Sequence, residues 1–257
     1  MKFLFLSKKA IIRVVIAMLV VAVIIAVVGL TQTSGVFLNK PLSKNSPINS
    51  LSTETKSIVI SVEINSDIET NTAILDAVTR ENVAFIVFIQ GQIVEINKDL
   101  LKKLSSNDKV SFGTNGNILT DNTVLTTKEM LQEIRTGREI LEKSIGKKIE
   151  YYRAPFGKYN DNLIDVVKKE GLFPIGGDID TIQYKNENTA NLAKKLISRV
   201  KSGSIINVSS LDTNAVSIIP LGISGLQAGL GFKIGKIDDL IIRENYIITS
   251  AGRQENK

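Results

Sequence analysis

Residues 83–89 read Val-Ala-Phe-Ile-Val-Phe-Ile, an apolar run with no polar position in it. A strand with one face in water alternates apolar and polar side chains, so this run predicts a strand that is covered on both faces. Such strands belong to parallel sheets with helices packed on them. Residues 57–62, Ser-Ile-Val-Ile-Ser-Val, have the same β-branched character and predict a second buried strand. The chain is therefore expected to fold in the α/β class.

Helical patterns separate the predicted strands. The clearest is 127–145, where Thr126 and Glu129 form a capping box and Gly146 ends the helix. Repeated β–α units predict a parallel sheet, either open or closed as a barrel. Further strands are expected at 110–112, 149–153, 172–175, 204–208 and 232–234, with helices at 97–105, 160–170, 188–201 and 215–228.

The N-terminus carries a different signal. Residues 14–30 contain no charge, and with the apolar residues before Arg13 the run is about long enough to cross a bilayer. We predict a transmembrane helix at 14–30, with the basic flank 1–13 in the cytoplasm and the remaining chain outside the cell membrane. The alternative is a cleaved signal peptide. The run exceeds the usual length of such a region, and Gly29-Leu30-Thr31 is a poor cleavage site.

The amino-acid composition predicts three segments in the part of the chain that follows the predicted transmembrane helix. Residues 31–56 are rich in Ser, Thr, Asn and Pro and are predicted to be a flexible linker. We expect the domain to occupy residues 57–250, followed by a polar tail at 251–257.

The charge and the missing residue types exclude several functions. The net charge of +6 comes mostly from residues 1–30, where four basic residues and no acid occur. The rest of the chain is nearly balanced, so no nucleic-acid partner is expected. Histidine and cysteine are absent, which excludes Ser-His-Asp catalysis and zinc sites built from these residues.

Function in this architecture lies at the carboxyl ends of the strands. Four charged residues are predicted there: Glu63, Arg153, Asp178 and Asp180. They are either an acid/base pair with a positioning cation or an ion-pair network that fixes the loops.

The order of several segments resembles the NodB-homology polysaccharide deacetylases, carbohydrate esterase family four. Residues 152–157, Tyr-Arg-Ala-Pro-Phe-Gly, resemble the family's R-P-P-Y-G motif and are followed by Tyr159 and Asn160. Residues 83–91, 203–206 and 232–240 resemble three of its strand segments. The resemblance covers about residues 57–243. It implies a distorted (β/α) barrel of parallel strands, and the predicted anchor resembles sporulation-associated deacetylases of Gram-positive bacteria.

The resemblance also implies a chemistry that this chain has lost. Family members deacetylate N-acetylglucosamine units with a divalent metal held by one Asp and two His. Those three positions fall on Ile64, Gly113 and Asn117, so no metal cofactor is expected. The base Asp becomes Glu63 and the acid His becomes Ser209. Glu63, Arg153 and Asp178 are thus interpreted as vestigial catalytic positions with a structural role.

Three functions remain open from the sequence. The first is a membrane-anchored module that binds cell-envelope glycan such as peptidoglycan without catalysis. Its predicted binding residues are Asn115, Asn117, Phe156, Tyr159, Asn207 and Ser209. The second is an envelope protein scaffold, and the third is residual hydrolysis by Glu63 with Asp178 or Asp180. The sequence does not predict an oligomeric state.

Overall fold

The structure is a computed structural model, and it describes residues 45–184, 186–212 and 214–257. The predicted basic flank, the transmembrane helix at 14–30 and most of the linker lie outside these residues. No helix within the described ranges is both long enough and apolar enough to cross a bilayer.

The centre of the domain is a curled sheet in which every strand pair is parallel. Its order is β6-β5-β4-β3-β2-β8-β7, and β9 pairs with the first residues of β2. All five residues of β3 are buried, as the apolar run predicted. The strands are β2 (Ser57–Glu63), β3 (Phe85–Ile89), β4 (Val110–Thr114), β5 (Tyr151–Tyr152), β6 (Phe173–Pro174), β7 (Ile179–Asp180), β8 (Ile205–Ser209) and β9 (Lys233–Ile234).

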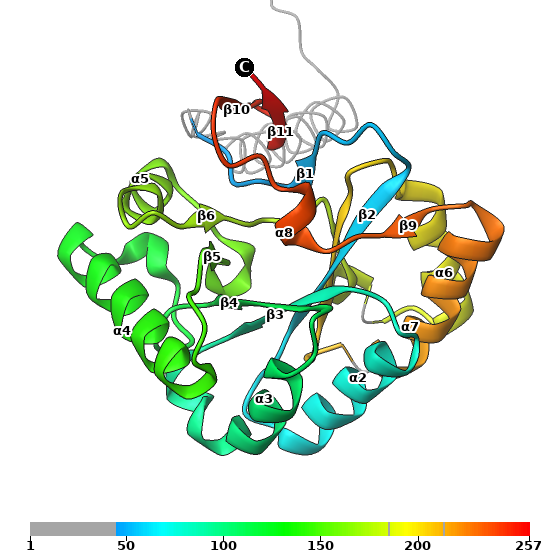
Figure 1. The fold of residues 1–257 in the computed structure, drawn as a ribbon, viewed down its shortest axis with the longest axis horizontal. Helices are drawn as coiled ribbons and strands as arrows, with labels where there is room; N and C mark the ends of the chain where they lie inside the picture. Colours follow the sequence, from blue (N-terminus) through cyan, green and yellow to red (C-terminus); the bar gives the residue numbers. More distant parts are fainter. Residues whose placement is uncertain (1–44, 185, 213) are drawn as a thin grey trace, which may run out of the picture. The chain divides into compact units, whose positions relative to one another are not determined.

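Helices form an outer arc around these strands (Figure 1). They are α2 (Ile68–Arg80), α3 (Lys98–Ser105), α4 (Thr127–Ile145), α5 (Asp161–Lys169), α6 (Thr189–Arg199) and α7 (Ala215–Ser224), with the short α8 (Ile237–Leu240) near the chain end. The local signals for α4 are confirmed. Thr126 and Glu129 form the capping box, and Gly146 ends the helix with a left-handed φ of 69°.

The predicted barrel is only half formed. β6 and β7 are the two edges of the curled sheet and are not paired with each other. The segment around β1 (Ser50–Leu51) spans this open side, because Ile48 bridges to Ile175 beyond β6 and Ser50 bridges to Ser204 before β8. Gly203 permits this contact, since a Cβ at that position would overlap the carbonyl oxygen of Leu51.

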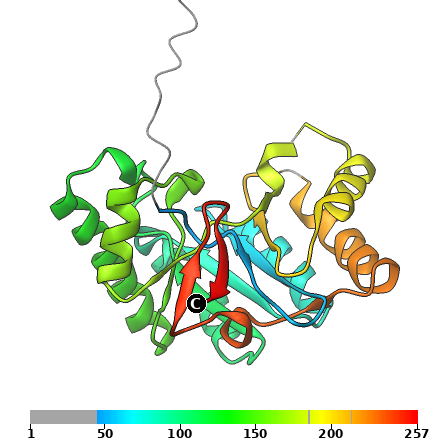
Figure 2. The same ribbon diagram turned by 90° about the horizontal axis from the view of Figure 1, so that it is seen from above.

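Both predicted domain boundaries need correction. β1 pairs with β11 (Arg253–Asn256), which also pairs with β10 (Tyr246–Ile248), so the predicted tail at 251–257 is part of a small sheet. Figure 2 shows β10 and β11 in red between the green α4–α5 side and the yellow and orange α6–α7 side. Ile48 and Leu51 are fully buried, so residues 45–56 belong to the domain and not to a flexible linker. These segments are too short and too polar to carry a periodic signal.

Candidate functional site

A pocket of about 170 Å³ opens at the carboxyl ends of the strands. Glu63 ends β2, Asp180 ends β7 and Ser209 ends β8, while Arg153 directly follows β5. Parallel strands deliver these residues to one edge of the sheet, where the predicted site was expected. The lining residues are Glu63, Ile64, Asn65, Gln90, Leu119, Arg153, Phe156, Asp180, Ile182, Ser209, Ser210 and Leu211.

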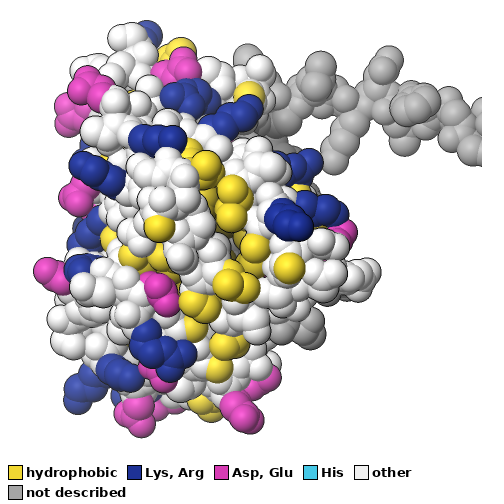
Figure 3. All heavy atoms as spheres, turned by 90° about the vertical axis from the view of Figure 1, so that its right-hand side faces the viewer, with side chains coloured by type: hydrophobic (Ala, Val, Ile, Leu, Met, Phe, Trp, Pro, Cys, Tyr) yellow, Lys and Arg dark blue, Asp and Glu magenta, His cyan; other side chains and the backbone are white. Residues whose placement is uncertain are grey.

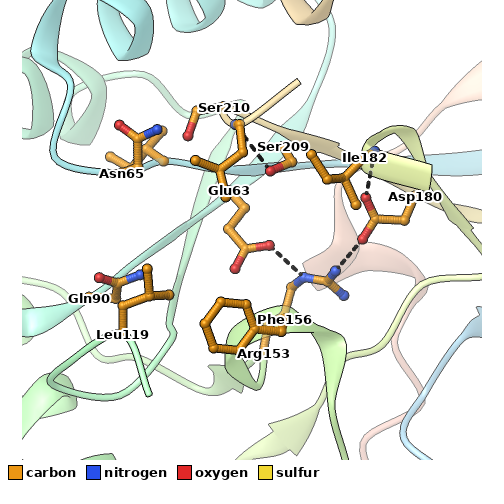
Figure 4. A pocket seen from close by; sticks show the side chains of 12 residues that line it. Glu63, Asn65, Gln90, Leu119, Arg153, Phe156, Asp180, Ile182, Ser209 and Ser210 are labelled. Carbon is orange, nitrogen blue, oxygen red and sulfur yellow. Dashed lines mark hydrogen bonds and ion pairs between the residues drawn. The ribbon is translucent and has the colours of Figure 1, made fainter. Parts of the chain in front are cut away.

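Arg153 forms the floor of this pocket and is only 2% exposed. Its Nε donates to Glu63 Oε2 at 3.1 Å, and its Nη2 donates to Asp180 Oδ2 at 2.7 Å. Figure 4 shows the guanidinium between these two carboxylates. Its Nη1 donates to the carbonyl of Gly176. Burial opposes the charge of Arg153, but the two carboxylates outweigh burial and raise its pKa.

Two buried amides hold the carboxylates from below. Asn115 donates to Glu63 Oε1 at 3.2 Å and to the Arg153 carbonyl at 2.9 Å. Asn207 donates to Asp180 Oδ2 at 3.0 Å and accepts a hydrogen bond from Ser61. Both side chains are fully buried and neither lines the pocket. The structure therefore places these two predicted glycan-binding residues beneath the pocket, where they orient Glu63 and Asp180.

The predicted role of Asp178 beside Arg153 needs correction. Its carboxylate accepts hydrogen bonds from the Ser204 hydroxyl at 2.7 Å and from the Ile205 amide at 3.0 Å. Burial raises the pKa of Asp178 despite these bonds. Asp180 occupies the position beside the guanidinium instead. The sequence carried no signal for this choice, because β7 has only two residues and both acids flank one isoleucine.

Phe156 stands at the rim of the pocket and is 55% exposed. Its backbone has a left-handed φ of 60°, a conformation that non-glycine residues rarely adopt outside constrained sites. The neighbouring Tyr159, predicted as a second aromatic contact, turns inward. Its hydroxyl donates to the carbonyl of Ile175 and accepts from the amide of Ala154, each at 2.8 Å. Burial raises the pKa of Tyr159, and the residue fixes the loop that carries Phe156.

The three positions that align with the family's metal ligands do not provide a set of metal-binding donor atoms. Ile64 is apolar and 1% exposed. Gly113 in β4 lies opposite Phe88 in β3, and a Cβ at Gly113 would overlap the Phe88 ring. Asn117 is half-buried, does not line the pocket, and offers at most a neutral amide oxygen. In the described part of the chain, no three His, Cys, Asp or Glu side chains are grouped to hold a metal ion. These residues do not fit the family's metal.

Apolar side chains contribute much of the pocket surface. Leu119 and Leu211 are about half exposed, and Ile64 and Ile182 lie deeper. Ser209, predicted as a binding residue, does line the pocket, and its hydroxyl oxygen accepts the amide of Leu211. Sequence reasoning missed Leu119, Ile182 and Leu211, because single leucines and isoleucines in loops carry no pattern that indicates a site.

The comparisons with known proteins agree with this geometry. A sequence profile described as polysaccharide deacetylase matches residues 50–175. The uncharacterized protein YlxY of Bacillus subtilis is 23% identical over 167 residues, which are 65% of this chain and 51% of that protein. The chain therefore spans about half the length of this curated relative.

Two solved structures share the fold. A CE4 family pseudoenzyme from Bacillus anthracis superposes with a TM-score of 0.70 at 18% identity, covering 77% of this chain and 69% of the other. The peptidoglycan deacetylase PdaC from Bacillus subtilis gives 0.62 at 19% identity, covering 72% and 90%.

Fold and motifs together define a NodB-like α/β domain with its pocket at the strand ends. Residues 50–175 of the chain match the polysaccharide deacetylase family, whose reaction is deacetylation, and this match confirms the resemblance drawn from the sequence motifs. The solved structures with this fold therefore include both a peptidoglycan deacetylase and a CE4 family pseudoenzyme.

Proposed function

We propose that this chain is a non-catalytic polysaccharide-deacetylase-like module that binds cell-wall glycan from a membrane anchor at residues 14–30. One observation carries the proposal: the pocket keeps its charged floor and an exposed aromatic rim, while the three metal-ligand positions are Ile64, Gly113 and Asn117. A hydrolase of this family without its Lewis acid lacks the group that polarises the acetyl carbonyl.

Retained strain at the rim supports a binding role. A non-glycine residue with φ near 60° costs on the order of 1 kcal/mol, and such residues persist where surrounding structure enforces them. Here the enforced conformation presents the Phe156 ring to solvent at the pocket. Aromatic faces are suitable surfaces for the apolar side of a sugar ring. The pocket volume also exceeds what a single water molecule requires by about tenfold.

The test is co-sedimentation of the purified protein with insoluble peptidoglycan. We expect the wild-type protein to pellet with the glycan and Phe156→Ala to remain largely in solution. Ile140→Ala is the matched control, because Ile140 is also an exposed apolar residue but lies on α4 and does not line the pocket. Equal pelleting of wild type and Phe156→Ala would exclude the pocket as the binding site.

Acetate release from N-acetylated glycan is measured in the same samples. We expect background levels both with and without an added divalent metal, because the donor positions cannot hold one. Release above background that disappears in Glu63→Gln would instead support residual hydrolysis.

A scaffold in the envelope is the second candidate, and one surface favours it. Figure 3 shows apolar side chains gathered on the side of the molecule that carries α6 and α7. Val216 and Leu221 of α7 are 37% and 53% exposed, whereas five of the ten residues of the helix are buried. Failure to bind any glycan would turn the search toward protein partners for this surface.

A further inference from the structure

We propose that the pocket prefers de-N-acetylated glycan, in which a glucosamine ammonium group binds at Glu63, over fully N-acetylated glycan. This inference rests on the proposed glycan-binding function and names the substrate class of the same pocket. It predicts that the module recognises the product of the family reaction and not its substrate.

The first step of the argument is the charge of the pocket. Its lining contains two carboxylates, from Glu63 and Asp180, and one guanidinium, from Arg153, so the formal charge is minus one. No lysine lines it. Lys158, adjacent to the rim, is paired with Asp121 at 2.7 Å and adds no net charge. A buried site with uncompensated negative charge favours a cationic ligand group.

The second step is the position of Glu63. Its Oε2 accepts from Arg153, while its Oε1 has the Asn115 amide at 3.2 Å as its hydrogen-bond donor. A carboxylate oxygen can accept two hydrogen bonds, so Oε1 retains one open acceptor position. Glu63 lines the pocket and its side chain is 15% exposed, so a ligand can reach this oxygen.

The third step is the polarity of the neighbouring groups. Oδ1 of the fully buried Asn115 has no hydrogen-bond partner but lies beneath the pocket, and the amide nitrogen of Asn115 donates to Glu63 and to the Arg153 carbonyl. Asp180 accepts from Arg153, Asn207 and the Ile182 amide. Among the charged side chains that line the pocket, the position left open is therefore the second acceptor position of Glu63 Oε1. An ammonium group carries three donors and a positive charge, whereas an acetamide offers one neutral N–H.

The experiment compares two ligands on the purified full chain by isothermal titration calorimetry. The probes are glucosamine oligomers and N-acetylglucosamine oligomers of equal length. We expect the glucosamine oligomer to bind about tenfold more tightly at low salt, because charge-assisted hydrogen bonds are about twice as strong as neutral ones. Raising the pH from about 6 to about 9, where an amine loses its charge, removes the preference without any mutation.

Variants locate the preference. Glu63→Gln keeps the size of the side chain and removes its charge, so the two ligands should bind it with similar affinity. Asp76→Asn is the matched control: it removes one acid on α2, whose partner is Lys103 and which does not line the pocket, and it should retain the wild-type preference. The pH comparison remains decisive if Glu63→Gln does not fold.

The outcomes separate the inference from the proposed function. Equal binding of both oligomers, or tighter binding of the acetylated one, overturns the ammonium preference while leaving a glycan-binding module. A glucosamine preference that survives in Glu63→Gln overturns the assignment to this residue. Binding of neither oligomer overturns both proposals together.

Discussion

The residues in and around the pocket form two halves: one keeps a complete ion-pair network, and the other lacks metal-binding side chains. One half, Arg153 between Glu63 and Asp180, is a complete ion-pair network supported by two buried amides. The other half, at the positions where the family resemblance places the metal ligands, consists of an isoleucine that lines the pocket and of a glycine and a half-buried asparagine that do not. The difference teaches that the residues which hold the loops together can persist without the residues which perform the chemistry. Removal of the buried guanidinium of Arg153 would leave two carboxylates without their cation, whereas an isoleucine and a glycine at the ligand positions leave no charge unpaired.

The largest effect is expected from breaking the intact half. Arg153→Ala leaves Glu63 and Asp180 without their cation in a buried site, so the free energy of unfolding should fall by about 3–5 kcal/mol. Thermal or urea unfolding followed by circular dichroism measures this change. Arg153→Lys should recover only part of the loss, because an ammonium cannot reproduce the fork that serves both carboxylates and the Gly176 carbonyl. An unchanged melting temperature for Arg153→Ala would contradict the comparison.

A smaller change in the free energy of unfolding is expected from adding a side chain at Gly113, in the half that lacks metal-binding side chains. Gly113→Ala places a methyl group against the buried Phe88 ring, and overpacking of this kind costs about 1–3 kcal/mol. The same unfolding measurement applies. Combining Gly113→Ala with Phe88→Leu should cost less than the sum of the two single changes, since the smaller side chain frees the space. Strict additivity would show that the Phe88 ring does not limit the space for a side chain at position 113.

The smallest effect is expected at a more exposed ion pair near the rim of the pocket, between Asp121 and Lys158. Its contribution to the free energy of unfolding serves as a reference for the buried network. Lys158 and Thr123 lower the pKa of Asp121 to about 2 by hydrogen bonding. Because this pKa lies below its ordinary value of 3.8, the stabilisation is present above about pH 4 and is lost as the pH falls toward 2. Asp121→Asn should therefore cost about 0.2–1 kcal/mol at neutral pH, and its difference from wild type should vanish near pH 2.

Unfolding curves of the wild type and of Asp121→Asn across this pH range provide the measurement. The difference between their free energies of unfolding removes the contribution that the other carboxylates make to both proteins. A gap between the curves that widens below pH 4 would contradict the lowered pKa. A cost at neutral pH close to that of Arg153→Ala would remove the distinction between buried and exposed ion pairs.

The sequence predicted the elements with strong local signals. The apolar run of β3 and the capping box of α4 were confirmed because each depends on residues close together in the chain. The position of the site at the strand ends followed from the parallel arrangement. The two domain boundaries were predicted wrongly, since β1 and β11 consist of only a few residues and pair with each other across about 200 residues of chain, with β10 on the other side of β11.

What the sequence by itself determined is the class of fold and the loss of catalytic side chains. The absence of histidine and the isoleucine at position 64 need no coordinates to be seen. Only the tertiary structure decided that Asp180, and not Asp178, pairs with Arg153, that Asn115 and Asn207 lie beneath the pocket, and that Phe88 covers Gly113. Those contacts join residues far apart in the chain, so they depend on how the strands are registered and the loops packed, which no local pattern records.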